Sequence, residues 1–272
     1  MVNQAIIPLA GLGTRLLPLS SVIPKELLPI NGKPNLEYIL DECIEAGIKQ
    51  FIFVVPKDRP SIKKYFFNDI FYKRIIKKKK NDKRINLVYK KIKKYQKMIK
   101  FVYQNKPKGT GDAVLKCQKY LKGNFFLLLL ADDLIVKKNC SKEMILLHKK
   151  TKASVIATKR VEKNTVSRWG ILGFKSKSKN SFLINRVIEK PKISEAPSNY
   201  AIIGRYILPT KIFSILKNQE KGKGGEVHIT DAIKTLVKKK EKFYGNIFKG
   251  KYIDCGTIEG FIKSGLKISK YL

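Results

Sequence analysis

Short apolar runs alternate with longer amphipathic stretches along the chain up to residue 160. The runs are rich in Ile, Val, Leu and Phe, and the stretches between them are long enough for a helix. This alternation is typical of a largely parallel sheet whose two faces are covered by helices. We therefore predict central strands at 4–9, 50–55, 99–103, 124–130 and 154–159.

Two of the intervening stretches have a helical pattern. In 34–46 the apolar residues recur at helical spacing, and Gly47 follows as a stop signal. A glycine-rich turn opens the second stretch, 109–120. Beyond residue 160 we expect shorter strands at 169–174, 182–189 and 199–208, followed by helix from Pro209. The chain is thus predicted to be an α/β protein.

Composition adds a large positive charge to this picture. The 272 residues contain 58 Lys and Arg against 21 Asp and Glu, a formal net charge of +37, while 43% of them are hydrophobic, which excludes disorder for most of the chain. Fourteen basic residues lie in 73–100, yet the remaining basic residues are spread along the whole chain. Nucleic-acid readers favour Arg, whereas this chain has eight Arg and 50 Lys. Biased composition therefore explains the charge better than a nucleic-acid partner does.

The chain start and the cysteines indicate a location. Residues 1–10 lack a basic leader followed by an apolar core, and the longest apolar run, 125–131, is far shorter than the roughly 20 residues that span a bilayer. We expect a cytoplasmic protein with no membrane partner. Four widely spaced cysteines form no CxxC pair, so we expect reduced, buried thiols and neither a zinc site nor a redox dithiol: Cys43, Cys117, Cys140 and Cys255.

A glycine-rich turn follows the first predicted strand, at the edge where a parallel sheet binds its ligands. Gly11 and Gly13 would let backbone N–H groups approach phosphate oxygens, and Arg15 adds a permanent cation. The third glycine of the dinucleotide fingerprint is missing, and no Gly-Lys-Ser/Thr of a P-loop is present. From these residues alone, a phosphate loop and a simple tight turn are both open.

The continuation Pro24-Lys25-Glu26-x-x-Pro29 favours the phosphate loop. Combined with the glycine-rich turn it resembles the sugar-nucleotide pyrophosphorylases, and Pro-Lys-Glu-x-Leu-Pro is most similar to the bacterial UTP–glucose-1-phosphate uridylyltransferases. Other blocks of that family occur in order: 104–114 (QNKPKGTGDAV), 130–134 (LADDL), Trp169-Gly170, 187–192 (VIEKPK), 196–206 (APSNYAIIGRY), 225–233 (GEVHITDAI) and Asp254-Cys255-Gly256.

The resemblance implies a three-layer α/β/α Rossmann-like nucleotidyltransferase fold with a mixed, mostly parallel sheet. It also implies a reaction in which UTP and glucose 1-phosphate give UDP-glucose and pyrophosphate with Mg²⁺. Residues 1–272 would form one domain, with a nucleotide-binding half (1–150), a sugar-phosphate half (151–230) and a helical oligomerisation segment (231–272). A homodimer or homotetramer is implied as well.

The resemblance assigns roles by position. Asp132 follows a buried strand, where a carboxylate can hold Mg²⁺ against phosphate oxygens, although a double Asp can also cap a turn. Glu189 and Lys190 could equally be an exposed strand end. His148 and His228 are expected to be surface or structural residues and not catalytic bases. The implied set comprises catalytic Arg15, Lys25 and Lys190; nucleotide-binding Ala10, Gly11, Gly13, Glu26, Gln104 and Gly109; sugar-phosphate-binding Gly170, Glu189 and Lys190; and metal-binding Asp132 and Asp254.

Three departures from the family pattern concern this set. Leu19-Ser20-Ser21 stands where Ala-Thr-Lys is usual, Trp169 replaces Tyr, and Ala131 occupies a position that is often Pro or Gly. Two alternatives also stay open at this point. One is a sister thymidylyl- or cytidylyltransferase, and the other is a non-catalytic nucleic-acid-binding protein.

Overall fold

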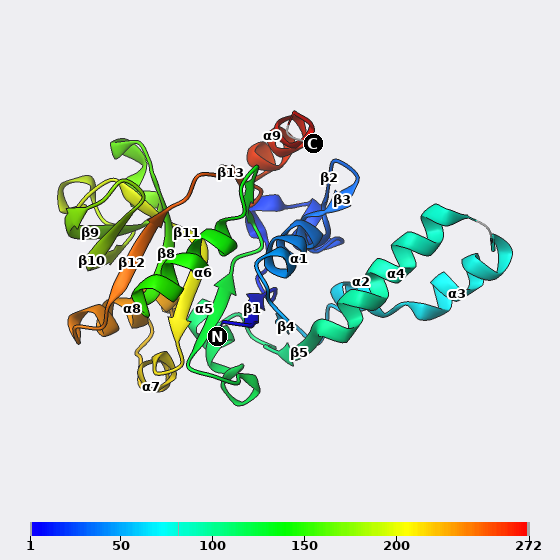
Figure 1. Ribbon diagram of the computed structural model, residues 1–272, viewed down its shortest axis with the longest axis horizontal. Helices are drawn as coiled ribbons and strands as arrows, with labels where there is room; N and C mark the ends of the chain where they lie inside the picture. Colours follow the sequence, from blue (N-terminus) through cyan, green and yellow to red (C-terminus); the bar gives the residue numbers. More distant parts are fainter. Residues whose placement is uncertain (1, 81, 271–272) are drawn as a thin grey trace.

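A nine-stranded sheet forms the centre of the protein, as a computed structural model that describes residues 2–80 and 82–270 shows (Figure 1). The strand order is β5-β4-β1-β6-β11-β8-β12-β10-β9. β10 and β11 run opposite to the other strands, so the sheet is mixed but mostly of one direction. The predicted mixed, mostly parallel sheet is confirmed.

The five strands predicted up to residue 160 are present with nearly the predicted bounds. They are β1 (Gln4–Pro8), β4 (Gln50–Val55), β5 (Ile99–Tyr103), β6 (Phe125–Leu129) and β8 (Ser154–Arg160). The prediction that each is central is wrong for β5, which forms one edge of the sheet and pairs with β4. Its residues are less buried than those of β4 for that reason.

The second half of the chain completes the sheet. β9 (Gly170–Lys177), β10 (Ser181–Glu189) and β11 (Tyr200–Pro209) match the three shorter strands that the sequence predicts. All ten residues of β11 are buried, because it lies between β6 and β8. Residues 231–272, predicted as a helical segment, also contain two strands. β12 (Phe243–Ile247) enters the main sheet, and β13 (Lys251–Asp254) pairs with β7 (Asp133–Val136).

Helices cover both faces of the sheet and give three layers. One core cluster packs the sheet against α1 (Asn35–Glu45) and α6 (Cys140–Thr151). A second cluster packs the opposite face against α5 (Thr110–Leu115), α7 (Ile212–Lys217) and α8 (Ile229–Lys238). On β1, Ile7 belongs to the first cluster and Ile6 to the second, as alternation along a strand requires. The single helix predicted for 109–120 is α5 followed by a separate 3₁₀ turn, η4 (Gln118–Tyr120).

The lysine-rich segment forms a helical hairpin that projects from the β5 edge of the sheet (Figure 1). It comprises α3 (Asp69–Lys78) and α4 (Lys83–Met98), and α2 (Ser61–Phe67) precedes it. Nothing in α3 is buried, whereas Ile92 and Tyr95 anchor α4 to the body. Among the described residues, no helix has the length and apolar character needed to cross a membrane.

Candidate active site

The turn after β1 has the shape that its glycines permit. Gly13 has a φ of 68°, in the left-handed region, and a Cβ there would lie 3.1 Å from the Cβ of Ser20. The Ser20 hydroxyl, which is buried, donates to the Gly13 carbonyl at 2.8 Å. Ser20, one of the departures noted in the sequence, therefore closes the turn. Arg15 follows on the 3₁₀ turn η1 (Thr14–Leu16).

A cavity of about 460 Å³ opens beside this turn, at the carboxyl ends of β1 and β6. Such a cleft at the carboxyl edge of a sheet is where open α/β proteins bind ligands. Its lining brings together residues that the sequence predicts for one site from positions far apart in the chain: Ala10, Gly11, Gly13, Lys25, Glu26, Gln104, Gly109 and Asp132.

Asp132 is the electrostatic centre of the cavity. Its Oδ2 atom accepts from Lys25 Nζ at 2.7 Å and lies 3.4 Å from Arg15 Nη2. Burial by itself would raise the pKa of Asp132, but the two cations outweigh it and hold that pKa below its usual value. Burial likewise acts to lower the pKa of Lys25, and the Asp132 carboxylate reverses this and raises it. The site thus holds one carboxylate and two permanent cations in direct contact.

Glu26 is 2% exposed and lines the same cavity. Its Oε1 atom has no hydrogen-bond partner among the described residues. Burial raises the pKa of Glu26 to about 7. A buried carboxyl group that faces a cavity with an unused oxygen is suited to accept a hydrogen bond from a bound ligand.

Gln104 and Gly109 also line the cavity. Gln104 is buried, and its side-chain amide donates to Asp112 Oδ2 at 2.5 Å. Gly109 has a φ of 98°, and a Cβ at that position would lie 2.6 Å from the Val227 carbonyl oxygen. Only glycine fits there, because the backbone of residues 226–227 packs directly against the turn. Glu226 also lines the cavity, although no role was predicted for it.

The predicted sugar-phosphate residues form a second group that does not line this cavity. Glu189 and Gly170 are paired between β10 and β9, and a Cβ on Gly170 would lie 3.1 Å from Glu189 Oε2. Lys190 adopts a left-handed φ of 45°, and its Nζ lies 4.0 Å from Glu189 Oε1. The Lys190 N–H donates to the Trp169 carbonyl.

Two aromatic residues link the second group to the Asp132 turn. The Trp169 ring packs edge-to-face against Tyr252, with ring centroids 6.0 Å apart. The Tyr252 hydroxyl donates to Asp133 Oδ1 at 2.6 Å. Burial and the neighbouring Asp132 raise the pKa of Asp133 to about 6. Trp169, another departure from the family pattern, therefore packs between the two groups of site residues.

Asp254 ends β13 opposite Asp133 in the β7–β13 ladder. Its Oδ1 atom accepts from the Gly256 N–H at 2.8 Å, and the next residue, Cys255, donates its N–H to the Asp132 carbonyl. Asp254 is thus tied to the Asp132 turn through the backbone, although it does not line the cavity. No group of three or more His, Cys, Asp and Glu suited to a metal ion occurs among the residues that the structure describes.

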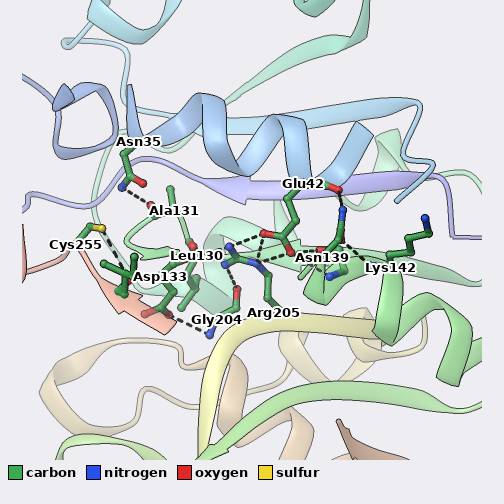
Figure 2. A network of polar contacts seen from close by, with 12 residues as sticks. Asn35, Glu42, Leu130, Ala131, Asp133, Asn139, Lys142, Gly204, Arg205 and Cys255 are labelled. Atoms are coloured by element: carbon green, nitrogen blue, oxygen red, sulfur yellow. Dashed lines mark hydrogen bonds and ion pairs between the residues drawn. The ribbon is translucent and has the colours of Figure 1, made fainter. Parts of the chain in front are cut away.

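Several polar residues behind the site have no role in the sequence prediction. Arg205 and Glu42 form an ion pair inside the core, and Asn35 donates to the Ala131 carbonyl at 2.6 Å (Figure 2). An Arg within the apolar strand 199–208 is a signal that could have located this network, because a buried charge requires a buried partner. His148 is buried and its Nδ1 lies 2.8 Å from the Ala153 carbonyl oxygen, consistent with a structural role. The four cysteines are free and buried, as expected.

A glycine-rich cavity whose Asp132 contacts two cations, at the carboxyl edge of a mixed α/β sheet, is typical of proteins that bind nucleotides. The family model described as nucleotidyl transferase matches residues 4–270. The chain belongs to this nucleotidyl transferase family.

Curated relatives cover nearly the whole chain. A putative UTP–glucose-1-phosphate uridylyltransferase of Methanocaldococcus jannaschii is 37% identical over 270 residues, which are 98% of this chain and 93% of that protein. UTP–glucose-1-phosphate uridylyltransferase 2 of Streptococcus pyogenes is 38% identical over 271 residues, which are 97% of this chain and 89% of that protein.

Solved structures agree with these relatives. UDP-glucose pyrophosphorylase in complex with UDP-glucose has a TM-score of 0.85 and 33% identity, and 99% of each chain is covered. The UTP-bound UGPase of Acinetobacter baumannii has a TM-score of 0.89 and 31% identity, with 98% of this chain and 93% of that chain covered. The predicted three-layer nucleotidyltransferase fold is confirmed.

Proposed function

We propose that this protein is a UTP–glucose-1-phosphate uridylyltransferase, which converts UTP and glucose 1-phosphate into UDP-glucose and pyrophosphate. The observation that carries the proposal is the contact of Asp132, which lines the glycine-walled cavity, with Lys25 and Arg15. The names of the curated relatives supply the base and the sugar.

The chemistry requires cations more than a nucleophilic side chain. A phosphate oxygen of glucose 1-phosphate attacks the α-phosphorus of UTP, and pyrophosphate leaves. Two unit negative charges 4 Å apart repel by about 4 kcal/mol at an effective dielectric of 20. Lys25 and Arg15 would offset the charge of the triphosphate, and Lys190 that of the sugar phosphate.

The remaining predicted residues bind and orient the two substrates in this proposal. Gln104 offers both an amide donor and a carbonyl acceptor, which suits a uracil edge. Glu26 adds the unpartnered carboxyl oxygen described above. Glu189, beside Lys190, would accept from the sugar hydroxyls, and Gly170 leaves the space in front of it. The nucleotide would be approached closely by the backbone of four residues: Ala10, Gly11, Gly13 and Gly109.

The carboxylates present fit Mg²⁺. Mg²⁺ is usually held by one or two carboxylates together with substrate phosphates, and not by a cage made of protein ligands alone. Asp132 provides one such carboxylate at the cavity. Asp254 provides a second, and its strand is joined to the Asp132 turn by the β7–β13 pairing and by the hydrogen bond from the Cys255 N–H to the Asp132 carbonyl. When bound there, Mg²⁺ would neutralise phosphate charge and align the α-phosphate.

Purified protein tests this function directly. We expect pyrophosphate release that requires UTP, glucose 1-phosphate and Mg²⁺ together. Asp132→Ala and Lys25→Ala should each lower kcat/KM on the order of 10³-fold, whereas Lys77→Ala, on the exposed hairpin, is the matched control and should have no effect. An active Asp132→Ala protein would contradict the metal assignment, and a clear preference for dTTP or CTP over UTP would contradict the base assignment.

Assembly and location belong to the same proposal. α9 (Ile258–Ser269) exposes Ile258, Ile262 and Leu266 on one face, which suits burial against another subunit in a homodimer or homotetramer. Residues 1–150 would bind the nucleotide, 151–230 the sugar phosphate, and 231–272 would supply the subunit contact. A cytoplasmic location is part of this proposal. Light scattering on purified protein measures the subunit number, and a monomer would contradict this assembly.

A further inference from the structure

Arg205 is a charged residue in the most deeply buried strand of the protein. It lies in β11, and its side chain is 0% exposed. Placing a guanidinium inside a core is costly unless ion pairing and hydrogen bonds compensate for the lost hydration. An apolar side chain at this position would fill the core without that cost. The groups that Arg205 contacts therefore indicate what its charge achieves.

The first partner of Arg205 is the Glu42 carboxylate on α1 (Figure 2). Arg205 Nε lies 3.3 Å and 3.2 Å from the two carboxylate oxygens, and Nη2 donates to Oε2 at 3.0 Å. Glu42 is fixed in turn by Ser141 at the start of α6, whose N–H and hydroxyl donate to Oε1 at 3.0 Å and 2.6 Å. The ion pair thus ties β11 to two helices on the same face of the sheet.

The other donors of Arg205 hold the turn that carries Asp132. Nη1 donates to the Leu130 carbonyl at 3.1 Å and also to the Gly204 carbonyl at 3.0 Å, and Nη2 donates to the Asp133 carbonyl at 2.7 Å. Between them, the Ala131 carbonyl accepts from Asn35 and the Asp132 carbonyl accepts from the Cys255 N–H. Every carbonyl from residue 130 to residue 133 therefore has a donor, and Arg205 supplies the first and the last.

We propose that Arg205 is a positioning residue for nucleotidyl transfer, because it holds the backbone of residues 130–133 so that the Asp132 carboxylate stays between Lys25 and Arg15. This inference rests on the proposed function of the site. Glu42 orients the guanidinium, and Arg205 touches neither the cavity nor the cations. A planar guanidinium with several fixed N–H donors reaches three carbonyls and a carboxylate at once, which the single ammonium of Lys cannot do.

The variant Arg205→Lys tests the proposal, since it keeps a positive charge beside Glu42 and removes the planar guanidinium with its several N–H donors. In protein that is folded by circular dichroism, we expect kcat to fall about 100-fold. The Mg²⁺ concentration for half-maximal rate should rise about tenfold. The KM for glucose 1-phosphate should stay within about threefold, because Glu189 and Lys190 are held by a different pair of strands.

Amide hydrogen exchange without substrate or metal provides a second, independent measurement. Peptides covering 126–136 should exchange about tenfold faster in Arg205→Lys than in the parent protein. This measurement separates the two proposals. An inactive parent would contradict the proposed function alone, while the exchange rates still decide whether Arg205 holds the turn.

Two further variants keep the test decisive. Lys93→Met breaks an ion pair with Asp69 on the projecting hairpin and should leave kcat and the exchange of 126–136 unchanged. If Arg205→Lys does not fold, the double variant Glu42→Leu with Arg205→Met removes both charges and should show the same loss of kcat and faster exchange. Parental kcat, or parental exchange of 126–136, in a folded Arg205 variant overturns the proposal.

Discussion

The buried carboxyl of Glu26 should make the stability of the protein depend on pH. Its pKa rises from 4.5 in the unfolded chain to about 7 in the folded protein, because burial disfavours the charged form. Between these two values the folded state holds a proton that the unfolded state has released. The free energy of unfolding therefore falls as pH rises from 4.5 to about 7. Below pH 4.5 the carboxyl is neutral in both states, and Glu26 then causes no loss of stability.

The size of the effect follows from the shift. One pKa unit corresponds to 1.36 kcal/mol, so Glu26 should cost the folded state about 3 kcal/mol at pH 8 relative to pH 4. Glu26→Gln is neutral at every pH and does not incur this cost. Relative to the parent, we expect the variant to gain about 3 kcal/mol of unfolding free energy between pH 4 and pH 8.

Urea denaturation of parent and variant at several pH values measures this difference, and it cancels most contributions from other titrating groups. Glu220→Gln makes the same chemical change on the surface and is the matched control. Its unfolding free energy should stay within about 0.5 kcal/mol of the parent. A difference between Glu26→Gln and the parent that is constant from pH 4 to pH 8 would refute the burial argument.

Three further outcomes are expected. Gly109→Ala should lose about 3 kcal/mol of stability, because strain at positive φ adds to the clash with the Val227 backbone. Gly47→Ala is the control for backbone strain alone, since Gly47 has a φ of 94° and no atom lies within 4 Å of the added Cβ. Equal losses of stability in the two variants would show that the contact with Val227 costs nothing. Ser20→Ala should lose about 1 kcal/mol in a urea titration, because the bond to the Gly13 carbonyl is lost, and an unchanged midpoint would argue against that bond. The net charge of +37 should make kcat/KM fall about fivefold between 50 and 500 mM KCl, and a flat salt profile would show that the surplus lysines do not attract the substrates.

The residues that line the cavity beside β1 and β6 could be predicted because several of them directly follow strands. Apolar runs end before the glycine-rich turn and before Asp132, and the carboxyl ends of neighbouring parallel strands meet at one edge. The sequence also contains Lys25 and Gln104 in recognisable blocks, and both line the cavity. Strand ends alone left a simple tight turn open, and the resemblance of these blocks to a known family was needed to predict that they form one site.

The support behind the site could not be predicted in the same way. Arg205 and Glu42 are 163 positions apart, and their pairing depends on β11 lying beside β6 and on α1 covering that face. The edge position of β5 is equally non-local, because it depends on which strands pair and not on the apolar run itself. Periodicity identifies an element, whereas its neighbours are decided by the packing of the whole sheet.

The position of β12 has a consequence for how the protein is made. Although it lies near the end of the chain, β12 is inserted between β8 and β10. During synthesis, β8 and β10 leave the ribosome well before the strand that must separate them. Until residue 247 has emerged, the β9–β10 hairpin is attached to the sheet only by the short β9–β11 pairing among the described strands. The pairing of β1, β4, β5 and β6 can thus form early on the ribosome, while the β8–β12–β10 part of the sheet is completed only after residue 247 has been made.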